Sequence, residues 1–131
     1  LKEYLKFSNE ETALILQIED VAVIPELDDI ASIPGFDILF VGIGDLSQSL
    51  GFTGDLYRPE IWEILKKVAE VAKRHGKFVG APGLSPEWTQ RLLDLGYRFI
   101  TSGADIVFLK RSFLQLREEY EKIGFSFNDL P

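Results

Sequence analysis

Two acidic side chains follow apolar segments that have the composition of buried strands. Glu19 comes directly after residues 13–18 (ALILQI), and Asp45 comes shortly after residues 38–43 (ILFVGI). A carboxylate at the end of an apolar strand is costly to bury unless a positive group meets it. Carboxylate oxygens are ligands that Mg²⁺ and Mn²⁺ prefer, with coordination positions left for substrate and water. Glu19 and Asp45 therefore form a candidate site for a divalent cation if the two strands are neighbours.

These residues also have ordinary structural interpretations. Asp45 could be only the N-cap of a short turn over residues 46–49, and Glu19 could be paired with an arginine. Gly42 and Gly44, on either side of Ile43, let the backbone approach a ligand closely and present N–H groups to an anion. They could equally form a tight turn between a strand and a helix. The residues by themselves leave these alternatives open.

The elements that must position these side chains alternate along the chain. The expected strands are residues 13–18, 38–43, 78–82 and 99–102, which are mostly apolar on both faces, as in a parallel sheet covered by helices. A helical lead is expected over residues 1–7, and further helices are expected over 25–33, 59–75, 85–95 and 105–123. Proline or serine marks most of their starts, and glycine marks their ends.

The alternation predicts an α/β fold with four β/α units and right-handed crossovers. Two closures are compatible with it: a small open doubly wound sheet, or half of a (β/α)₈ barrel, whose complete form takes about 250 residues. No G-x-G-x-x-G motif follows the first strand, so dinucleotide binding has no support. In either closure ligands bind at the carboxyl ends of the strands, where Glu19 and Asp45 lie.

Composition excludes several classes of protein. The chain has 131 residues, of which 46% are hydrophobic, and it has no cysteine and no methionine. A disulfide framework, a thiolate metal site and a cysteine nucleophile are therefore absent. A formal net charge of −7 without a basic stripe argues against nucleic acid as a partner. No apolar run approaches the roughly 18 residues of a membrane span, so a cytoplasmic protein without a membrane partner is expected.

Longer motifs carry a specific resemblance. The segments L-Q-I-E at 16–19, L-D-D-I-A-S-I-P-G-F-D-I-L-F-V-G-I-G-D-L-S at 27–47 and G-Y-R-F-I-T-S-G-A-D at 96–105 resemble the HpcH/HpaI aldolase family of the phosphoenolpyruvate/pyruvate barrel superfamily. The first strand resembles the fifth of eight in that family. The resemblance therefore implies that residues 1–131 form one partial domain, the C-terminal half of a TIM (β/α)₈ barrel. A chain that begins with Leu1 rather than methionine agrees with this expectation.

The resemblance implies a class II, metal-dependent pyruvate aldolase in the complete protein. Glu19 and Asp45 match the family's metal-binding carboxylates, with Mg²⁺, Mn²⁺ or Co²⁺ as the cation. Gln17 matches the glutamine beside the metal, and residues 42–44 match the backbone that receives the pyruvate carboxylate. Such enzymes cleave a 4-hydroxy-2-oxo acid, of the 2,4-dihydroxyhept-2-enedioate or 2-dehydro-3-deoxyglucarate type, to pyruvate and an aldehyde through a metal-stabilised enolate.

The match has one departure and one gap. The family usually has proline where Ile43 stands, so this turn has an additional N–H and a less restricted φ. The family's active-site arginine and histidine lie in the first half of the barrel, and this chain does not supply them. His75 and Lys77 are expected at the opposite end of the sheet, and Lys110 falls in a helix, which argues against a Schiff-base mechanism. We therefore expect the chain alone to be inactive.

Two other functions are compatible with the sequence. The chain could be a catalytically silent half-barrel that acts as an association module, because a half-barrel exposes a sheet edge and an apolar seam. It could also belong to an acyl lyase like the β subunit of citrate lyase, which uses an acid pair on the same strands. The last helix of the aldolase family exchanges between subunits, so the resemblance also implies a homo-oligomer in which residues 105–123 pack on a second copy.

Overall fold

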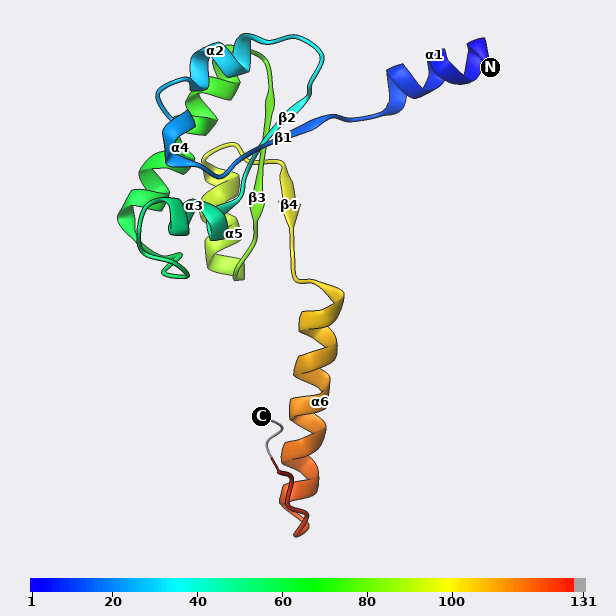
Figure 1. Ribbon diagram of the computed structural model, residues 1–131, viewed down its shortest axis with the longest axis vertical. Helices are drawn as coiled ribbons and strands as arrows, with labels where there is room; N and C mark the ends of the chain where they lie inside the picture. The colour runs from blue at the N-terminus through cyan, green and yellow to red at the C-terminus, as the bar shows by residue number, and fades with distance from the viewer. Residues whose placement is uncertain (129–131) are drawn as a thin grey trace. The chain divides into compact units, whose positions relative to one another are not determined.

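The computed structural model describes residues 1–128, which fall into two compact units, Leu1–Thr101 and a second unit that begins at Ser102. The first unit contains a four-stranded sheet and its helices, and the second contains one long helix (Figure 1). The elements are, in chain order, α1 (Lys2–Glu11), β1 (Ile15–Ile18), η1 (Val21–Val23), α2 (Leu27–Ser32), β2 (Ile38–Val41), α3 (Ile43–Ser49), α4 (Pro59–Arg74), β3 (Phe78–Pro82), α5 (Pro86–Asp94), β4 (Phe99–Thr101) and α6 (Asp105–Glu121).

The sheet is parallel throughout, with the strand order β1-β2-β3-β4. Neighbouring strands are therefore consecutive in the sequence, as in a (β/α)₈ barrel, and the predicted four β/α units are confirmed. One cross-strand row joins Gln17, Phe40, Gly80 and Phe99. The carboxyl ends of β1 and β2 lie side by side, as the candidate cation site requires.

Several element boundaries differ from the sequence prediction. The first strand begins at Ile15 rather than at residue 13, because the N–H of Leu14 bonds to the carboxylate of Asp37 at 2.8 Å rather than to a neighbouring strand. The second strand ends at Val41, and Ile43 begins α3. The lead helix α1 extends to Glu11 instead of ending near residue 7, and it buries none of its side chains.

The two faces of the sheet have different surroundings. Leu39, Val41, Val79 and Ala81 are buried on the face covered by α4, whose apolar stripe includes fully buried Leu65. Figure 1 shows the helices between the strands on this side of the sheet. The opposite face carries apolar side chains that the described residues leave open: Ile15 is 37% exposed, Phe78 62% and Phe99 39%. Half of a barrel has this arrangement, because its inner face lacks the opposing strands.

Tyr97, in the loop before β4, is anchored in the core. Its side chain is fully buried, and its hydroxyl donates a hydrogen bond of 3.0 Å to the Leu65 carbonyl in α4. Burial raises the pKa of this phenol far above its ordinary value. We expect Tyr97→Phe to lower the free energy of unfolding by about 1 kcal/mol, the usual net value of one hydrogen bond. Chemical denaturation measures the change, and Tyr57→Phe, which alters a side chain that is 66% exposed, is the control and should have no effect.

Asp28 connects α2 to the C-terminal end of α4. Its carboxylate bonds to Nε2 of His75 at 2.9 Å and also to the guanidinium of Arg74. The hydrogen bond to His75 and, secondarily, Arg74 lower the pKa of Asp28 below its ordinary value of 3.8. A carboxylate with a lowered pKa stabilises the fold above its ordinary pKa, and this contribution is lost as the pH falls through the lowered value.

We therefore expect Asp28→Asn to destabilise the protein at neutral pH and to have a much smaller effect at a pH below the lowered pKa of Asp28. Urea denaturation at both pH values measures the two differences from wild type. Asp29→Asn changes the neighbouring exposed carboxylate and is the matched control. An Asp28→Asn effect that is the same at both pH values would show that the pairing with His75 and Arg74 does not stabilise the fold.

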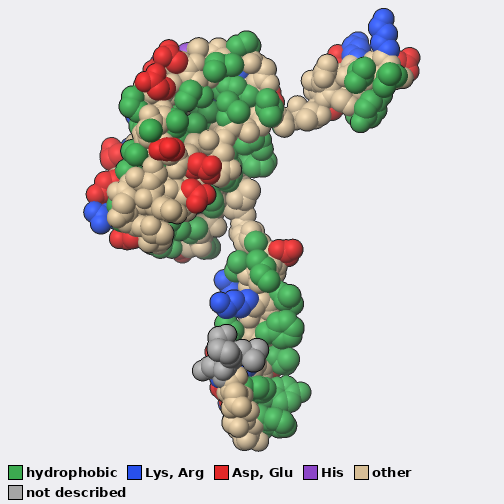
Figure 2. Space-filling view, viewed as in Figure 1, with side chains coloured by type: hydrophobic (Ala, Val, Ile, Leu, Met, Phe, Trp, Pro, Cys, Tyr) green, Lys and Arg blue, Asp and Glu red, His purple; other side chains and the backbone are tan. Residues whose placement is uncertain are grey.

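The second unit consists of α6 and the segment after it. The predicted helix over residues 105–123 is confirmed, although α6 ends at Glu121. None of its side chains is buried, and Figure 2 shows hydrophobic side chains along its length. No helix in the part of the chain that the structure describes has the length and apolar character needed to cross a membrane.

Candidate metal and pyruvate site

The carboxyl end of β1 carries Gln17 and Glu19 against the backbone of the neighbouring strand. The Gln17 side-chain amide donates a hydrogen bond to Oε2 of Glu19. Gly42 directly follows β2, and its N–H donates to the Ile18 carbonyl at 3.0 Å, which extends the parallel pairing by one residue. A Cβ on Gly42 would lie 2.7 Å from Nε2 of Gln17 and 3.0 Å from Oε2 of Glu19. Only glycine at position 42 therefore leaves both side chains in place.

Asp45 lies in the first turn of α3. The helix begins at Ile43 with Gly42 as its N-cap, and the Leu46 N–H bonds to the Gly42 carbonyl at 2.9 Å. The interpretation of Asp45 as an N-cap is therefore wrong, because Asp45 is the third residue of the helix and its side chain is exposed. The predicted strand over residues 38–43 is also too long. The Ile43 side chain is buried in the core, so only its backbone can face a ligand.

In the part of the chain that the structure describes, Glu19 is not paired with an arginine, which was the structural alternative to a role in metal binding. Within residues 1–128 its carboxylate accepts a hydrogen bond from Gln17 and forms no ion pair. Its side chain is half-buried, whereas Asp45 is exposed. Both acids are thus available at the same edge of the sheet, one at the end of β1 and one in the first helical turn after β2.

Ser47 connects the first turn of α3 to the loop that follows this helix. Apart from aromatic residues, it is the only polar side chain that is buried within the described residues. Its hydroxyl donates to the Gly44 carbonyl at 2.6 Å and accepts from the Gly54 N–H at 2.9 Å. The Phe52 N–H bonds to the Ser47 carbonyl at 3.0 Å. These hydrogen bonds attach the loop after α3 to the helical turn that carries Gly44 and Asp45.

Asp20 and Ser49 connect the end of β1 to the end of α3. Oδ1 of Asp20 accepts hydrogen bonds from the Ala22 N–H at 2.9 Å and from the Ser49 hydroxyl at 3.0 Å. These two donors lower the pKa of Asp20, with Ala22 as the larger cause. The Ser49 hydroxyl also accepts from the Val21 N–H at 2.9 Å. Sequence reasoning assigned no role to either side chain.

The inner row next to Gln17 is aromatic. The rings of Phe40 and Phe99 meet edge to face, with centroids 6.1 Å apart. A Cβ on Gly80 would lie 2.8 Å from the Phe40 ring and 2.8 Å from the Phe99 carbonyl oxygen, so glycine is required between them. The candidate site is therefore bordered by apolar surface on the inner face of the sheet.

The donor set fits a hard divalent cation that shares its coordination with substrate. No group of three or more acidic, histidine or cysteine side chains capable of holding a metal ion is found within residues 1–128. Two carboxylates beside an amide are, however, a donor set that Mg²⁺ or Mn²⁺ accepts when water or substrate oxygens complete the coordination. The missing side chain at Gly42 leaves room for the Glu19 carboxylate at this edge of the sheet. Glu19 and Asp45 are the residues that could hold such an ion.

The remaining candidates have structural roles. His75 is the C-cap of α4 and bonds to Asp28, as expected for a helix C-terminal residue. Nζ of Lys77 donates to the Phe36 carbonyl at 2.7 Å at the amino end of β3, away from the candidate site. Asp105 is the first residue of α6, after the N-cap Ala104, and its carboxylate accepts a hydrogen bond from the Ile106 N–H. Trp62 and Trp88 are buried and pack on each other, with ring centroids 4.2 Å apart.

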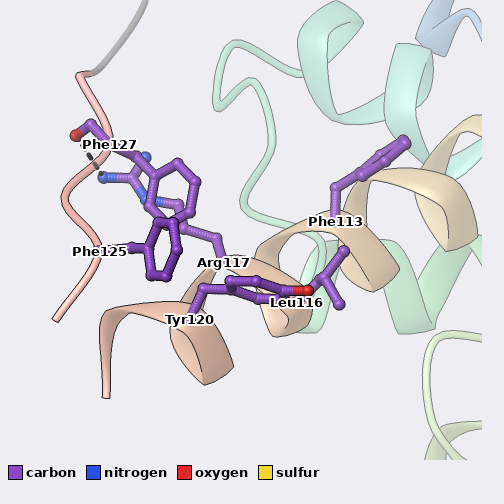
Figure 3. Close-up of a pocket in the computed structure, with 6 residues that line it drawn as sticks. All are labelled: Phe113, Leu116, Arg117, Tyr120, Phe125 and Phe127. Atoms are coloured by element: carbon purple, nitrogen blue, oxygen red, sulfur yellow. Dashed lines mark hydrogen bonds between the residues drawn. The ribbon is translucent and has the colours of Figure 1, made fainter. Parts of the chain in front are cut away.

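The second unit contains a cavity of its own, of about 420 Å³. Figure 3 shows its walls, which are formed by Phe113, Leu116, Arg117, Tyr120, Phe125 and Phe127. Tyr120 and Phe125 pack edge to face, and Arg117 lies over the Phe127 ring. None of the predicted site residues lines this cavity, and its walls offer no carboxylate.

Comparison with known proteins decides which family this site belongs to. The sequence model of the HpcH/HpaI aldolase/citrate lyase family matches residues 2–111. The chain belongs to this family. The predicted resemblance of the chain to this family is thereby confirmed.

The chain is also similar to curated proteins that are named as aldolases. The chain is 32% identical over 112 residues to a hydroxypyruvate/pyruvate aldolase of Delftia acidovorans, covering 86% of this chain and 42% of that protein. It is 30% identical over 120 residues to a 5-keto-4-deoxy-D-glucarate aldolase of Salmonella paratyphi C, covering 92% and 47%. The chain thus spans about half the length of the curated relatives that it matches.

A solved structure of the same family also matches this chain over about half of its own length. The crystal structure of an HpcH/HpaI aldolase/citrate lyase family protein from Burkholderia cenocepacia is similar with a TM-score of 0.79 and 34% identity. The match covers 92% of this chain and 47% of that one. The four parallel β/α units are therefore about half of the barrel of this HpcH/HpaI family, and the doubly wound alternative is excluded.

Proposed function

We propose that this chain supplies the metal- and pyruvate-binding half of a class II aldolase, formed by the C-terminal strands of its barrel. The complete protein would cleave a 4-hydroxy-2-oxo acid to pyruvate and an aldehyde. One observation carries the proposal: Glu19 and Asp45 follow adjacent parallel strands, and between them Gly42 leaves the space that Gln17 and Glu19 fill. The names of the relatives, a hydroxypyruvate/pyruvate aldolase and a 5-keto-4-deoxy-D-glucarate aldolase, support the substrate class.

Each residue of the site has a proposed part. Glu19 and Asp45 would hold Mg²⁺, Mn²⁺ or Co²⁺, and Gln17 would orient the Glu19 carboxylate through the hydrogen bond to Oε2. When bound, the cation supplies a Lewis acid for the keto oxygen of pyruvate. The first N–H groups of a helix have no partner within the helix, so those of Ile43, Gly44 and Asp45 are donors for the pyruvate carboxylate. Asp45 would thus contribute both a carboxylate and a backbone donor.

The acid–base part of the reaction requires groups that this chain does not place at the site. The single histidine, His75, bonds to Asp28 at the C-terminal end of α4. We propose that an arginine and a histidine from additional strands complete the site, and that these strands cover the open face that carries Phe78 and Phe99. Residues 1–131 would then be one part of a single barrel domain. The chain alone should release pyruvate at no more than the background rate.

We also propose that α6 packs on a second copy of the protein. Its apolar side chains are all substantially exposed within the described residues, a surface that association would bury. They are Ile106, Val107, Phe108, Leu109, Phe113, Leu114 and Leu116. Light scattering tests this proposal, because a complete protein that stays monomeric at micromolar concentration would contradict exchange of the helix.

A cleavage assay tests the proposed function. The complete protein that contains this chain is mixed with a 4-hydroxy-2-oxo acid, and pyruvate is detected with lactate dehydrogenase and NADH. We expect pyruvate release that EDTA abolishes and that Mg²⁺ or Mn²⁺ restores. Borohydride treatment in the presence of pyruvate is the control for a lysine mechanism. Cleavage that resists EDTA, or a covalent pyruvate adduct after reduction, would contradict a metal-dependent mechanism.

A further inference from the structure

Helix α3, which carries Asp45, is attached at both ends to the segment that carries Glu19. At its N-terminal end the Gly42 N–H bonds to the Ile18 carbonyl at 3.0 Å. At its C-terminal end the Ser49 hydroxyl donates to Oδ1 of Asp20 at 3.0 Å and accepts from the Val21 N–H at 2.9 Å. These two attachments fix the direction of α3 together with its buried side chains Ile43 and Leu46.

Both attached segments are held by further contacts. Asp20 is the N-cap of η1, and its Oδ1 accepts a hydrogen bond from the Ala22 N–H at 2.9 Å. This bond holds the Asp20 side chain independently of Ser49. In α3 the buried Ser47 hydroxyl bonds to the Gly44 carbonyl, and Leu46 is fully buried. A shift at one end of α3 is therefore transmitted to the other.

The attachment lies next to both proposed ligands. Asp20 follows Glu19 directly in the chain, and Ser49 is four residues after Asp45, on the same side of the helix. A cap for η1 would require only Asp20, since the Ala22 N–H already satisfies that role. Ser49 is exposed and could bond to water, yet its hydroxyl joins two segments that are 29 residues apart in the sequence.

From this geometry we propose that Asp20 and Ser49 form a positioning clamp that holds Asp45 in register with Glu19 for a divalent cation. The proposal rests on the proposed metal site and adds two residues that do not touch the cation. Residues that orient metal ligands typically change metal affinity 10- to 100-fold when they are removed. Loss of the clamp should therefore weaken binding even though both carboxylates stay in the chain.

Ser49 gives the sharper test because its replacement changes no charge. Mn²⁺ binding to the complete protein is measured by electron paramagnetic resonance, and we expect about tenfold weaker binding for Ser49→Ala. Ser49→Thr keeps the hydroxyl and should restore most of the affinity. Ser32→Ala is the matched control, because Ser32 is also the exposed last residue of a helix and its hydroxyl bonds only to the Asp29 carbonyl. Thermal unfolding should be nearly the same for all these proteins.

A double-mutant cycle with Asp20→Ala tests whether the two residues act together. If they form one clamp, adding Ser49→Ala to Asp20→Ala should weaken Mn²⁺ binding no further. Hydrogen exchange gives a readout without metal: the Val21 N–H should exchange faster in Ser49→Ala than in wild type. Wild-type affinity in Ser49→Ala, or fully additive effects in the cycle, would overturn the clamp while leaving the metal site intact. A wild-type protein that binds no Mn²⁺ would overturn both proposals.

Discussion

Replacement of Glu19 by glutamine together with Asp45 by asparagine should abolish divalent-cation binding and reduce metal-dependent cleavage to the background rate. Each substitution keeps the size of the side chain and removes one of the two proposed carboxylate ligands, so a hard cation would lose both of its charged partners. Glu19 keeps a hydrogen-bond contact with Gln17 in either form, and Asp45 is exposed. The fold should therefore tolerate the change, with a free energy of unfolding within about 0.5 kcal/mol of wild type.

The measurement is isothermal titration of Mg²⁺ and Mn²⁺ into the complete protein, with circular dichroism as the test of folding. The matched control replaces one exposed glutamate and one exposed aspartate on helices away from the site, Glu70→Gln with Asp29→Asn. This control has the same change in net charge, so it separates loss of ligands from loss of long-range attraction. Unchanged affinity in the Glu19 and Asp45 double variant would place the cation elsewhere.

Gly42→Ala should damage the same site without removing any ligand. The new Cβ would lie 2.7 Å from Nε2 of Gln17 and 3.0 Å from Oε2 of Glu19, distances at which one of the groups must move. The backbone at Gly42 has a φ of −80°, which alanine adopts, so the effect comes from the contact and not from strain in the main chain. We expect Mn²⁺ binding at least tenfold weaker, in the range found when groups that orient metal ligands are disturbed.

Gly44→Ala is a close control for this substitution. Gly44 lies in the first turn of α3, and a Cβ there would meet no atom within 4 Å beyond its chain neighbours and the backbone of its own helix. Alanine also favours the helix more than glycine does, so the fold should be as stable as wild type or slightly more stable. Mn²⁺ affinity measured without pyruvate should be unchanged in Gly44→Ala. Equal losses in the two alanine variants would contradict a specific role for the space at Gly42.

The sheet and the position of the acids followed from the sequence because their signals are local. Segments that are apolar on both faces predict parallel strands, and a charged residue at the end of such a segment marks its boundary. In the structure β1 ends at Ile18, and Glu19 is the next residue. Helix starts at Pro59 and Pro86 were equally predictable, because proline at the first helical position has a fixed φ and needs no N–H partner.

The start of α3 could not be read in the same way. Ile43 continues an apolar run and is β-branched, so its local preference is for a strand. In the structure it begins a helix, because the Gly42 carbonyl accepts the Leu46 N–H and the Ile43 side chain packs into the core. Tertiary packing overrides local preference here, and the same change moves Asp45 from a loop into a helical turn.

The contacts that hold the site together were also beyond sequence reasoning. The Ser49–Asp20 bond joins residues 29 positions apart, and it forms only because the fold brings the end of α3 next to the segment after β1. The spacing of Asp45, Ser47 and Ser49 was visible, but it does not indicate which hydroxyl is buried and which is exposed. The bond between His75 and Asp28 spans 47 positions and depends in the same way on the packing of α2 against α4.

Binding of Mn²⁺ and pyruvate to the same site is the most direct test of the proposed half-site. If pyruvate chelates the cation held by Glu19 and Asp45, each ligand must tighten the binding of the other by the same factor. Titration of Mn²⁺ into the complete protein, with and without saturating pyruvate, measures this factor. We predict one Mn²⁺ per chain and a tighter dissociation constant with pyruvate, both lost in the Glu19→Gln, Asp45→Asn double variant. An Mn²⁺ affinity that pyruvate leaves unchanged would contradict the account.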